Sequence, residues 1–259
     1  MIMSQIPQKI VITGASRGIG RELALKYGRR GSELALMARS TDDLAGLSQK
    51  IESIGGRAHF IECDVSNRQQ VHEAFDYAKN KLGNLDIVFL NAGVGGQSWF
   101  AEGDVSQLKK IIEVNVLGVA YAMECVVPAM KQRGRGKIAI TGSLAESRGF
   151  PGNGAYCASK AAIGHIAESA RVELKEYGID VITIKPGFIR TDMTDKNDFY
   201  MPFLMEAAEA ADLIVEKIDS GYARISFPMP TAFASWFGKL VPGAIFEWFA
   251  KMRNKPIMK

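Results

Sequence analysis

Near its N-terminus the chain reads Lys9-Ile-Val-Ile-Thr-Gly14-Ala-Ser-Arg-Gly18-Ile-Gly20-Arg-Glu-Leu-Ala-Leu-Lys-Tyr27, and this stretch decides the fold. A short apolar run ends in glycine, and residues with helical spacing follow the last glycine, so we expect a buried strand, a glycine loop and a helix. Glycines let a backbone approach a phosphate closely, and the free N–H groups of a helix N-terminus attract it. A tight turn that binds nothing is the alternative. We predict a dinucleotide site formed by Gly14, Ser16, Arg17, Gly18, Ile19 and Gly20.

Strand-like and helix-like segments alternate along the rest of the chain, without a linker or a repeat. The further strands are expected at 32–39, 58–65, 86–91, 137–143, 180–185 and 223–228. The further helices are expected at 44–54, 68–82 and 107–133, from residue 156 onward, and at 207–219. Such alternation predicts an α/β fold with a doubly wound parallel sheet. We assign 1–228 to one nucleotide-binding domain and 229–259 to a hydrophobic C-terminal extension.

The end of the second expected strand indicates which dinucleotide is bound. A carboxylate at this point suits the ribose 2′-hydroxyl of NAD, whereas arginine suits the 2′-phosphate of NADP. The strand ends in Arg39-Ser40, and Arg17 lies in the glycine loop. Two guanidinium groups near one phosphate favour NADP, and two solvated arginines are the alternative. Asp64 and Val65, at the end of the third strand, are expected to flank an adenine, unless Asp64 serves only as a turn residue.

Small and polar residues follow the later strands. Asn91-Ala92-Gly93 ends the fourth strand and would let backbone lie against the ribose and diphosphate. Pro186-Gly187 ends the sixth strand, and Ile189 and Thr191 after it are expected to contact the cofactor. Asn115 sits among apolar residues of a long helical pattern, where a buried structural amide is the ordinary interpretation.

Ser143 and the Tyr156-Cys-Ala-Ser-Lys160 segment carry the predicted chemistry. Tyr156 and Lys160 are four residues apart and therefore share one helix face. An ammonium one turn away favours the phenolate, so we expect the pKa of Tyr156 to lie below its ordinary value of about 10. Such a pair can donate and accept a proton near neutral pH. Ser143 ends the fifth strand, at the edge where open α/β sheets bind ligands.

Composition narrows the classes of function. Apolar residues make up 47% and charged residues 23%, which is typical of a soluble globular protein. The net charge of +4 is spread out, and without a basic stripe we expect no nucleic-acid partner. Cys63, Cys125 and Cys157 show no paired spacing, which favours a reducing, cytoplasmic compartment. The N-terminus lacks the apolar run of a signal peptide, and no metal ion is expected.

The C-terminal segment 232–252 is rich in aromatic residues and is followed by Arg253, Lys255 and Lys259. Lys239, Pro242 and Glu247 interrupt it, so it is too short to span a membrane. We expect it to pack against a partner subunit or over the substrate pocket, or to contact a membrane surface peripherally. Residues 192–205 are irregular and rich in Met, Phe and Tyr, which suggests a lid.

Taken in order, these motifs resemble the classical short-chain dehydrogenase/reductase family. They are Thr13-Gly14-x-x-x-Gly18-x-Gly20, Asn91-Ala92-Gly93, Asn115, Ser143, Tyr156-x-x-x-Lys160 and Pro186-Gly187. The resemblance implies a Rossmann-type fold and hydride transfer between a nicotinamide and a carbonyl or secondary alcohol. It also implies roles for individual residues: Tyr156 as general acid/base, Ser143 on the substrate oxygen, Lys160 on the nicotinamide ribose, Asn115 holding a water beside Lys160, and Thr191 near the carboxamide.

The hydrophobic extension departs from many family members and resembles those that act on lipophilic or steroid-like substrates. We therefore expect an NADP-dependent oxidoreductase that acts on an apolar carbonyl or alcohol and forms a homodimer or homotetramer. The alternative is a nucleotide-binding regulatory or scaffold protein that has lost the chemistry. Substrate contacts are expected from Ser143, Phe150, Tyr156, Phe188 and Met193.

Overall fold

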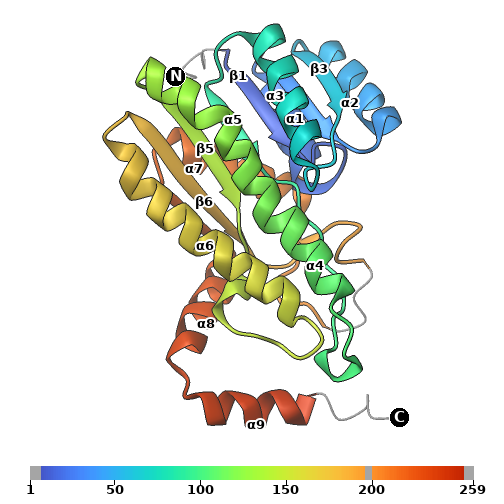
Figure 1. Cartoon of the computed structure of the whole chain (residues 1–259), viewed down its shortest axis with the longest axis vertical. Coiled ribbons are helices and arrows are strands. Elements are labelled where there is room, and N and C mark those ends of the chain that lie inside the picture. The colour runs from blue at the N-terminus through green and yellow to red at the C-terminus, as the bar shows by residue number, and fades with distance from the viewer. Residues whose placement is uncertain (1–6, 196–199, 254–259) are drawn as a thin grey trace.

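A computed structural model describes residues 7–195 and 200–253 of the 259-residue chain. Its main sheet has seven strands in the order β3-β2-β1-β4-β5-β6-β9, and every neighbouring pair is parallel. The strands are β1 (Lys9–Thr13), β2 (Glu33–Ala38), β3 (Arg57–Glu62), β4 (Ile87–Leu90), β5 (Gly136–Thr141), β6 (Ile179–Pro186) and β9 (Arg224–Phe227). This is the predicted Rossmann-type sheet (Figure 1).

Helices cover both faces of the sheet. They are α1 (Gly18–Arg29), α2 (Thr41–Ser53), α3 (Arg68–Leu82), α4 (Ser106–Ile112), α5 (Gly118–Arg133), α6 (Gly154–Lys175), α7 (Ala207–Asp219), α8 (Met229–Leu240) and α9 (Gly243–Arg253). Short helical turns lie at η1 (Phe100–Glu102), η2 (Glu113–Leu117) and η3 (Leu144–Ser147). A separate two-stranded ladder joins β7 (Ile189–Arg190) to β8 (Met205–Glu206), on either side of the predicted lid. Residues 196–199 of that lid lie outside the described residues.

The period of two along each strand separates two cores. In β1, Ile10 and Ile12 pack into one cluster with α1, α2 and α7, whereas Val11 packs into the other with α3, α5 and α6. All three side chains are fully buried. Because both faces of the sheet are covered, a central strand such as β4 is apolar and buried along its whole length, whereas the edge strands β3 and β9 also carry exposed polar residues.

The long helical pattern at 107–133 contains a feature that periodicity did not predict. The helix changes to a π-helical turn at η2, between α4 and α5, and Asn115 lies inside this turn. A π-turn adds one residue to the helical repeat and occurs frequently at functional sites. The apolar pattern continues across it, which is why the sequence indicates one uninterrupted helix.

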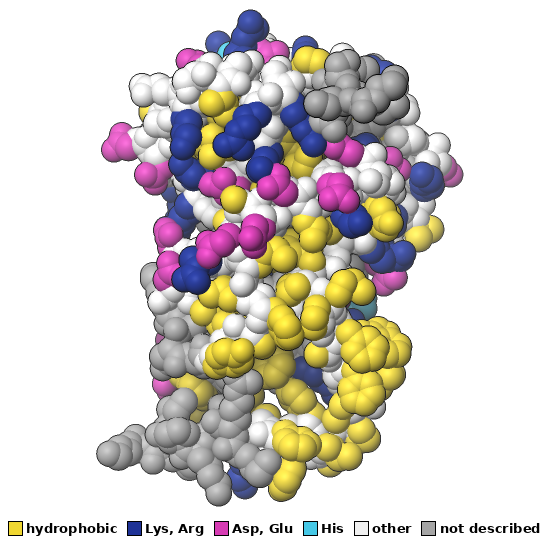
Figure 2. Space-filling view, turned by 180° about the vertical axis from the view of Figure 1, so that it is seen from behind, with side chains coloured by type: hydrophobic (Ala, Val, Ile, Leu, Met, Phe, Trp, Pro, Cys, Tyr) yellow, Lys and Arg dark blue, Asp and Glu magenta, His cyan; other side chains and the backbone are white. Residues whose placement is uncertain are grey.

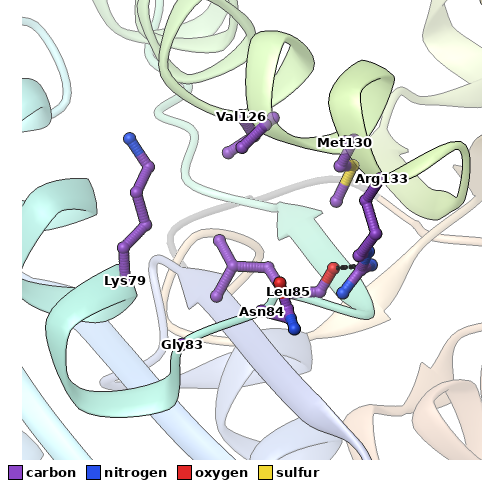
Figure 3. A pocket seen from close by; sticks show the side chains of 8 residues that line it. Lys79, Gly83, Asn84, Leu85, Val126, Met130 and Arg133 are labelled. Atoms are coloured by element: carbon purple, nitrogen blue, oxygen red, sulfur yellow. Dashed lines mark hydrogen bonds between the residues drawn. The ribbon is translucent and has the colours of Figure 1, made fainter.

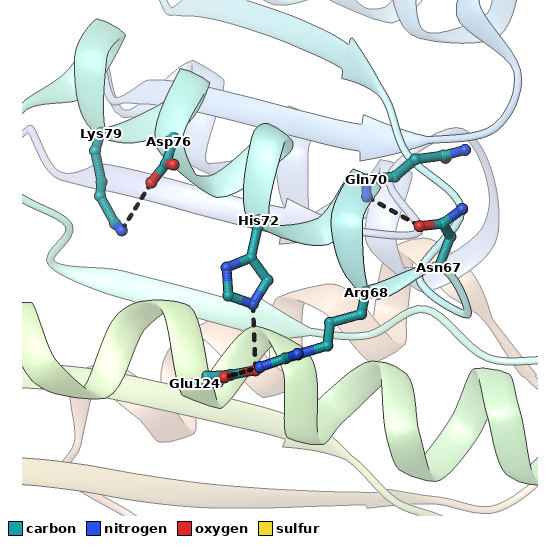
Figure 4. A network of polar contacts seen from close by, with 7 residues as sticks. All are labelled: Asn67, Arg68, Gln70, His72, Asp76, Lys79 and Glu124. Carbon is teal, nitrogen blue, oxygen red and sulfur yellow. Dashed lines mark hydrogen bonds and ion pairs between the residues drawn. The ribbon is translucent and has the colours of Figure 1, made fainter.

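The combined helix Ser106–Arg133 is long and apolar enough, by composition alone, to cross a membrane. In this fold it packs on the sheet, and Val126 and Met130 belong to the core. Its outer side contacts α3 through Glu124, which accepts hydrogen bonds from Arg68 and bonds the ring of His72 at 3.2 Å (Figure 4). These contacts fix α5 against α3 and leave its other side toward α6.

A small cavity of about 40 Å³ lies between the C-terminal ends of α3 and α5 (Figure 3). Leu85, Met130 and Arg133 help to line it, and Arg133 donates a hydrogen bond to the carbonyl of Leu85. The segment that includes Leu85 precedes β4, so the cavity is at the amino edge of the sheet. Its volume suits a water molecule rather than an organic substrate.

The C-terminal helices extend beyond the sheet, and α9 lies across the lower end of the molecule (Figure 1). Hydrophobic side chains gather over this lower part, whereas charged side chains cover the upper part (Figure 2). Helix α8 has no buried residue. Apolar residues of α8 and α9 that are exposed are Met229, Phe233, Trp236, Phe237, Leu240, Ile245, Trp248 and Phe249.

Candidate active site

Four parallel neighbours bring the predicted motifs to one edge of the sheet. Gly14 follows β1, Asn91 follows β4, Ser143 follows β5 and Gly187 follows β6. These strands are adjacent in the order β1-β4-β5-β6, so their carboxyl ends meet. The expected strand 137–143 stops at Thr141, which places Ser143 in the loop as the residue before η3.

The glycine loop has the tight geometry expected of it. Gly14 and Gly18 have φ angles of 67° and 56°, a region that favours glycine. A Cβ on Gly20 would lie 2.3 Å from the carbonyl oxygen of Gly14, so no larger residue fits there. The geometry of the turn by itself therefore accounts for these glycines, so they are not sufficient evidence for a bound dinucleotide.

The start of α1 provides the additional evidence for an anion. No side chain caps this helix, and its first turn carries no acidic residue. By contrast, Ser40 caps α2 and Asn67 caps α3 through hydrogen bonds to Asp43 N and Gln70 N. The free N–H groups of α1 and its dipole therefore suit the diphosphate of a dinucleotide.

A hydrogen-bond network joins the ends of β1, β4 and β5. The Thr13 hydroxyl accepts from the backbone N–H groups of Asn91 and Ala92 at 3.0 and 3.1 Å. The Asn91 amide donates to the carbonyls of Thr13 and Gly14, and its Oδ1 accepts from Thr141 Oγ1 at 3.2 Å. Asn91 thus holds the glycine loop in place, whatever its predicted contact with a cofactor.

Asn115 is buried and uses its amide on protein groups. Its Oδ1 accepts from Val94 N at 2.8 Å, and its Nδ2 donates to Val94 O at 2.9 Å and to Ser159 Oγ at 3.0 Å. Ser159 Oγ in turn donates to the Tyr156 carbonyl at 2.7 Å. Asn115 therefore connects the loop after β4 to the first turns of α6, as a structural amide would. The predicted water beside Lys160 stays a prediction.

Lys160 is only 5% exposed. Its Nζ donates to the Thr141 carbonyl at 2.8 Å and lies 5.7 Å from the centre of the Tyr156 ring. Burial lowers the pKa of Lys160 to about 8, because the charged form loses its hydration. A Cβ on Gly93 would lie 3.3 Å from Asn115 Oδ1 and 3.6 Å from Lys160 Nζ, so both groups border this glycine.

The Ser143 side chain lies within reach of the Tyr156 hydroxyl and lowers the pKa of Tyr156 by hydrogen bonding. Burial raises the pKa of Tyr156, and the bond to Ser143 offsets this only in part. The sequence-based expectation of a lowered pKa is therefore wrong for the chain by itself. The reason is that desolvation of the buried phenolate outweighs the hydrogen bond from Ser143.

The arginines predicted for the 2′-phosphate lie where the sequence places them, one directly after β2 and one in the glycine loop before α1. Arg39 follows β2 and is exposed. Arg17 pairs with Asp192 at 3.0 Å, and both side chains are more than 60% exposed, so this contact is easily exchanged. Ser40 caps α2, in agreement with the interpretation of Ser40-Thr41-Asp42 as a helix start.

Asp64 and Val65 both have structural partners. Asp64 Oδ1 accepts from Ser66 N and Ser66 Oγ at 2.9 and 2.7 Å, which is the turn role left open by the sequence. The pKa of Asp64 lies below its ordinary value. Burial alone would raise it, but the bonds from Ser66 and the charges of Arg39 and Lys110 lower it by more. Val65 is 8% exposed and packs in the core. Contact of this segment with adenine stays a prediction.

The segment after β6 returns to the glycine loop. Thr191 Cγ2 would lie 3.0 Å from a Cβ on Gly18. Thr194 Oγ1 accepts from Thr191 N and donates to the Ile189 carbonyl, which fixes this turn. The Ile189 side chain is 4% exposed and belongs to the core, so only its backbone is open to a cofactor. The buried Pro186 precedes Gly187, whose N–H donates to Phe227 O at 2.7 Å.

The predicted substrate residues occupy two places. Met193 Sδ and Tyr156 Cδ2 would lie 3.4 and 3.9 Å from a Cβ on Gly95, so Met193 and Tyr156 both border this glycine. Phe150 instead contacts Phe246 of α9, with ring centres 5.5 Å apart at 70°. Phe188 is half-buried and accepts a hydrogen bond from Met205 N.

Sequence reasoning missed two residues that hold the site together. Thr141 accepts from Lys160 through its carbonyl, and Ser159 connects Asn115 to Tyr156. Ser159 is fully buried, and a polar residue directly before Lys160 was the available signal.

Comparisons with known proteins agree with this geometry. Residues 8–199 match the short chain dehydrogenase family. An uncharacterised oxidoreductase of Myxococcus xanthus is 36% identical over 241 residues, covering 93% of this chain and 95% of the relative. A short-chain dehydrogenase/reductase from Burkholderia phymatum, solved with NAD, has a TM-score of 0.82 at 25% identity and covers 95% of this chain and 96% of its own.

A 7α-hydroxysteroid dehydrogenase, solved with NADH and 7-oxo glycochenodeoxycholic acid, has a TM-score of 0.80 at 26% identity. The match covers 86% of this chain and 94% of the other. The oxidoreductase relatives, the fold and the tyrosine, serine and lysine at one sheet edge lead to the same conclusion. The chain belongs to the short-chain dehydrogenase/reductase family and is an NAD(P)-dependent oxidoreductase that acts on CH–OH or carbonyl groups.

Proposed function

We propose that this chain is an NADP-dependent oxidoreductase that interconverts an apolar ketone or aldehyde and its alcohol, with Tyr156 as general acid/base. The contact between the Tyr156 hydroxyl and Ser143, with the Lys160 ammonium on the same helix face, is the observation that carries this proposal. An inactive scaffold is less well supported, because burying a lysine costs stability that a scaffold does not need.

The chain's own groups handle the proton and the substrate oxygen. Ser143 hydrogen-bonds that oxygen, and Tyr156 donates a proton to it in reduction or accepts one in oxidation. Because burial raises the pKa of Tyr156, the hydroxyl keeps its proton at neutral pH, which suits an acid for carbonyl reduction. Lys160 holds a positive charge beside the developing phenolate and stabilises it.

A nicotinamide dinucleotide fits the remaining groups. The uncapped start of α1 would hold the diphosphate, and Lys160 would hold the nicotinamide ribose. The bound nicotinamide supplies or accepts the hydride. At the adenosine end, the residue that directly follows β2 is Arg39 and not a carboxylate, and Arg17 lies in the glycine loop. Both arginines favour a 2′-phosphate.

The substrate is inferred to be lipophilic. Met193 and Tyr156 both border Gly95, and the Phe150–Phe246 pair brings an aromatic residue of α9 to the loop before α6. An alicyclic ketone would bury apolar area against such groups. The similar 7α-hydroxysteroid dehydrogenase was solved with a 7-oxo steroid, which is consistent with this class.

The exposed apolar surface of α8 and α9 is inferred to bind a second copy of the chain. Phe233, Trp236, Phe237, Trp248 and Phe249 are each more than 50% exposed, and aromatic residues are enriched in the cores of protein interfaces. Patches of this kind rarely face water on a monomer. The three cysteines are free and buried, which suits a reducing compartment such as the cytoplasm.

The first prediction concerns the proton donor. Tyr156→Phe should lower kcat for ketone reduction by roughly 10²–10⁴-fold, because the general acid is removed. The Kd for NADPH, measured by fluorescence, should change less than about twofold, since the phenol is not needed for phosphate binding. A variant that keeps full turnover would remove the mechanism. Tyr177→Phe, on the surface beyond α6, is the matched control.

The second prediction concerns the cofactor. Arg39→Ala should raise the Kd for NADPH by roughly 10- to 100-fold, because one charge-assisted bond to a phosphate is lost. The Kd for NADH, which lacks the 2′-phosphate, should hardly change. Arg57→Ala on β3 removes another exposed arginine and serves as the control. Equal loss of NADPH and NADH affinity would count against NADP preference.

The third prediction follows from the buried lysine. The pKa of Lys160 is about 8 in the native state, against 10.5 ordinarily. Between these values the unfolded chain binds more protons than the native one, so stability rises with pH. Relative to Lys160→Met, the wild type should gain up to roughly 3 kcal/mol in free energy of unfolding from pH 7 to 10.5. Urea titrations would show this. The difference in free energy of unfolding between the wild type and Lys50→Met, a change at an exposed site, should stay the same over this pH range.

The fourth prediction concerns assembly. Light scattering should give a dimer or tetramer for the wild type, and a lower mass for Phe237→Ser/Trp248→Ser, because the shared apolar surface is broken. Val105→Ser, an exposed apolar residue distant in sequence from α8 and α9, should not change the mass. A monomeric wild type that sediments with phosphatidylglycerol vesicles would instead identify this surface as a membrane contact.

A further inference from the structure

The turn that follows Ser143 contains a buried carboxylate that the proposed reaction does not use. Glu146 lies in η3, and its side chain is 8% exposed. Its Oε1 accepts from Lys185 Nζ at 2.6 Å. Lys185 is the residue of β6 before Pro186-Gly187, so this ion pair ties the turn after β5 to the end of the neighbouring strand.

The second carboxylate oxygen faces the helix that carries Tyr156 and Lys160. Glu146 Oε2 is buried and has no hydrogen-bond partner among the described residues. A Cβ on Gly164 of α6 would lie 2.7 Å from this oxygen, closer than such atoms approach each other. Gly164 is one helical turn beyond Lys160, so the carboxylate packs directly on this helix, and a larger side chain at Gly164 would have to displace it.

The same turn is also attached to the C-terminal helix α8. Lys239 Nζ lies 3.4 Å from Glu146 Oε1, and Ser235 Oγ donates to the Leu144 carbonyl at 2.9 Å. From the other end of the turn, Arg148 Nε donates to the Gly238 carbonyl at 2.8 Å, and its guanidinium lies 5.2 Å from the centre of the Phe246 ring. Three side chains therefore cross between the catalytic turn and the C-terminal segment.

From this arrangement we infer that Glu146 is a positioning residue: it holds Ser143 in its place against Tyr156 and, through Lys239, makes that place depend on the docking of α8. The inference rests on the proposed function, since it concerns the geometry of the proposed catalytic pair. It extends that function by giving the C-terminal segment a role in turnover.

The energetics support a role in position rather than in stability. A carboxylate that is taken out of water and paired with ammonium groups contributes little net stability, because desolvation offsets the attraction. Its directional contacts nevertheless restrict the turn. Ser143 is three residues before Glu146, and Glu146 N donates to the Ser143 carbonyl at 3.3 Å, so a shift of one moves the other. A displacement of about 1 Å at a reacting group can cost about 100-fold in rate.

The test compares full-length Glu146→Gln and Lys239→Met with the wild type, using NADPH with cyclohexanone, 2-decalone and acetophenone. Glu146→Gln should lower kcat by about 10-fold or more, and Lys239→Met by about threefold, because the second change releases only α8. The Kd for NADPH should stay within about twofold. Lys251→Met on α9 removes a lysine that makes no recorded contact with Glu146, and it should leave kcat unchanged.

A double-mutant cycle separates positioning from a general structural effect. In a Ser143→Ala background Glu146→Gln should cause little further loss, because the group that it positions is gone. Gly164→Ala gives an independent variant: its methyl group should displace the carboxylate and lower kcat, although alanine favours the helix. Equal losses from Glu146→Gln with and without Ser143 would overturn the inference.

Hydrogen exchange supplies a readout that needs no substrate. Glu146→Gln and Lys239→Met should each increase exchange in peptides covering 143–148 and 229–241, relative to Lys251→Met. If exchange rises in only one of the two segments, α8 and the turn are not coupled and the inference fails. If coupling is found but the wild type reduces none of the ketones, the proposed reaction fails while the anchor is retained.

Discussion

Parallel pairing of β1, β4, β5 and β6 is the constraint on which the site depends. Parallel strands run in the same direction, so the loops after them emerge at one edge of the sheet, whatever their distance along the chain. The glycine loop, Asn91, Ser143 and Gly187 are brought together in this way. The hydrogen bonds of Thr13 and Asn91 then fix the carboxyl ends of β1, β4 and β5 relative to one another. The loops that carry the predicted site residues begin at these fixed ends.

Burying the Lys160 ammonium costs the fold stability, because the charged group loses its hydration. The ammonium donates a hydrogen bond to the Thr141 carbonyl, and burial lowers the pKa of Lys160 to about 8. A lysine in such a place is poorly explained by packing. The proposed reaction explains it, because there the neighbouring phenol of Tyr156 carries negative charge while it gives up its proton. The raised pKa of Tyr156 fits the same picture, because a group that stays protonated until it reacts can act as an acid.

The C-terminal helices α8 and α9 contact the turn that follows Ser143. They leave a large aromatic surface exposed, yet their inner side is attached by polar contacts to the turn beside Ser143. Whatever binds the outer surface therefore acts on elements that are joined to the catalytic edge. In the proposed arrangement, Glu146 is the side chain that connects this outer surface to Ser143.

The sequence by itself determined most of the strands and helices, the parallel sheet and the motifs that follow its strands, but not the β7–β8 ladder or helices α8 and α9. Periodicity is a local property, and it correctly predicted α3 at 68–82 and α7 at 207–219. Tertiary structure alone decided the π-turn around Asn115, the direction of the Tyr156 pKa shift and the partners of Glu146. Each of these depends on burial or on contacts between distant residues, such as Glu146 and Lys239, which are 93 positions apart, and no local pattern encodes them.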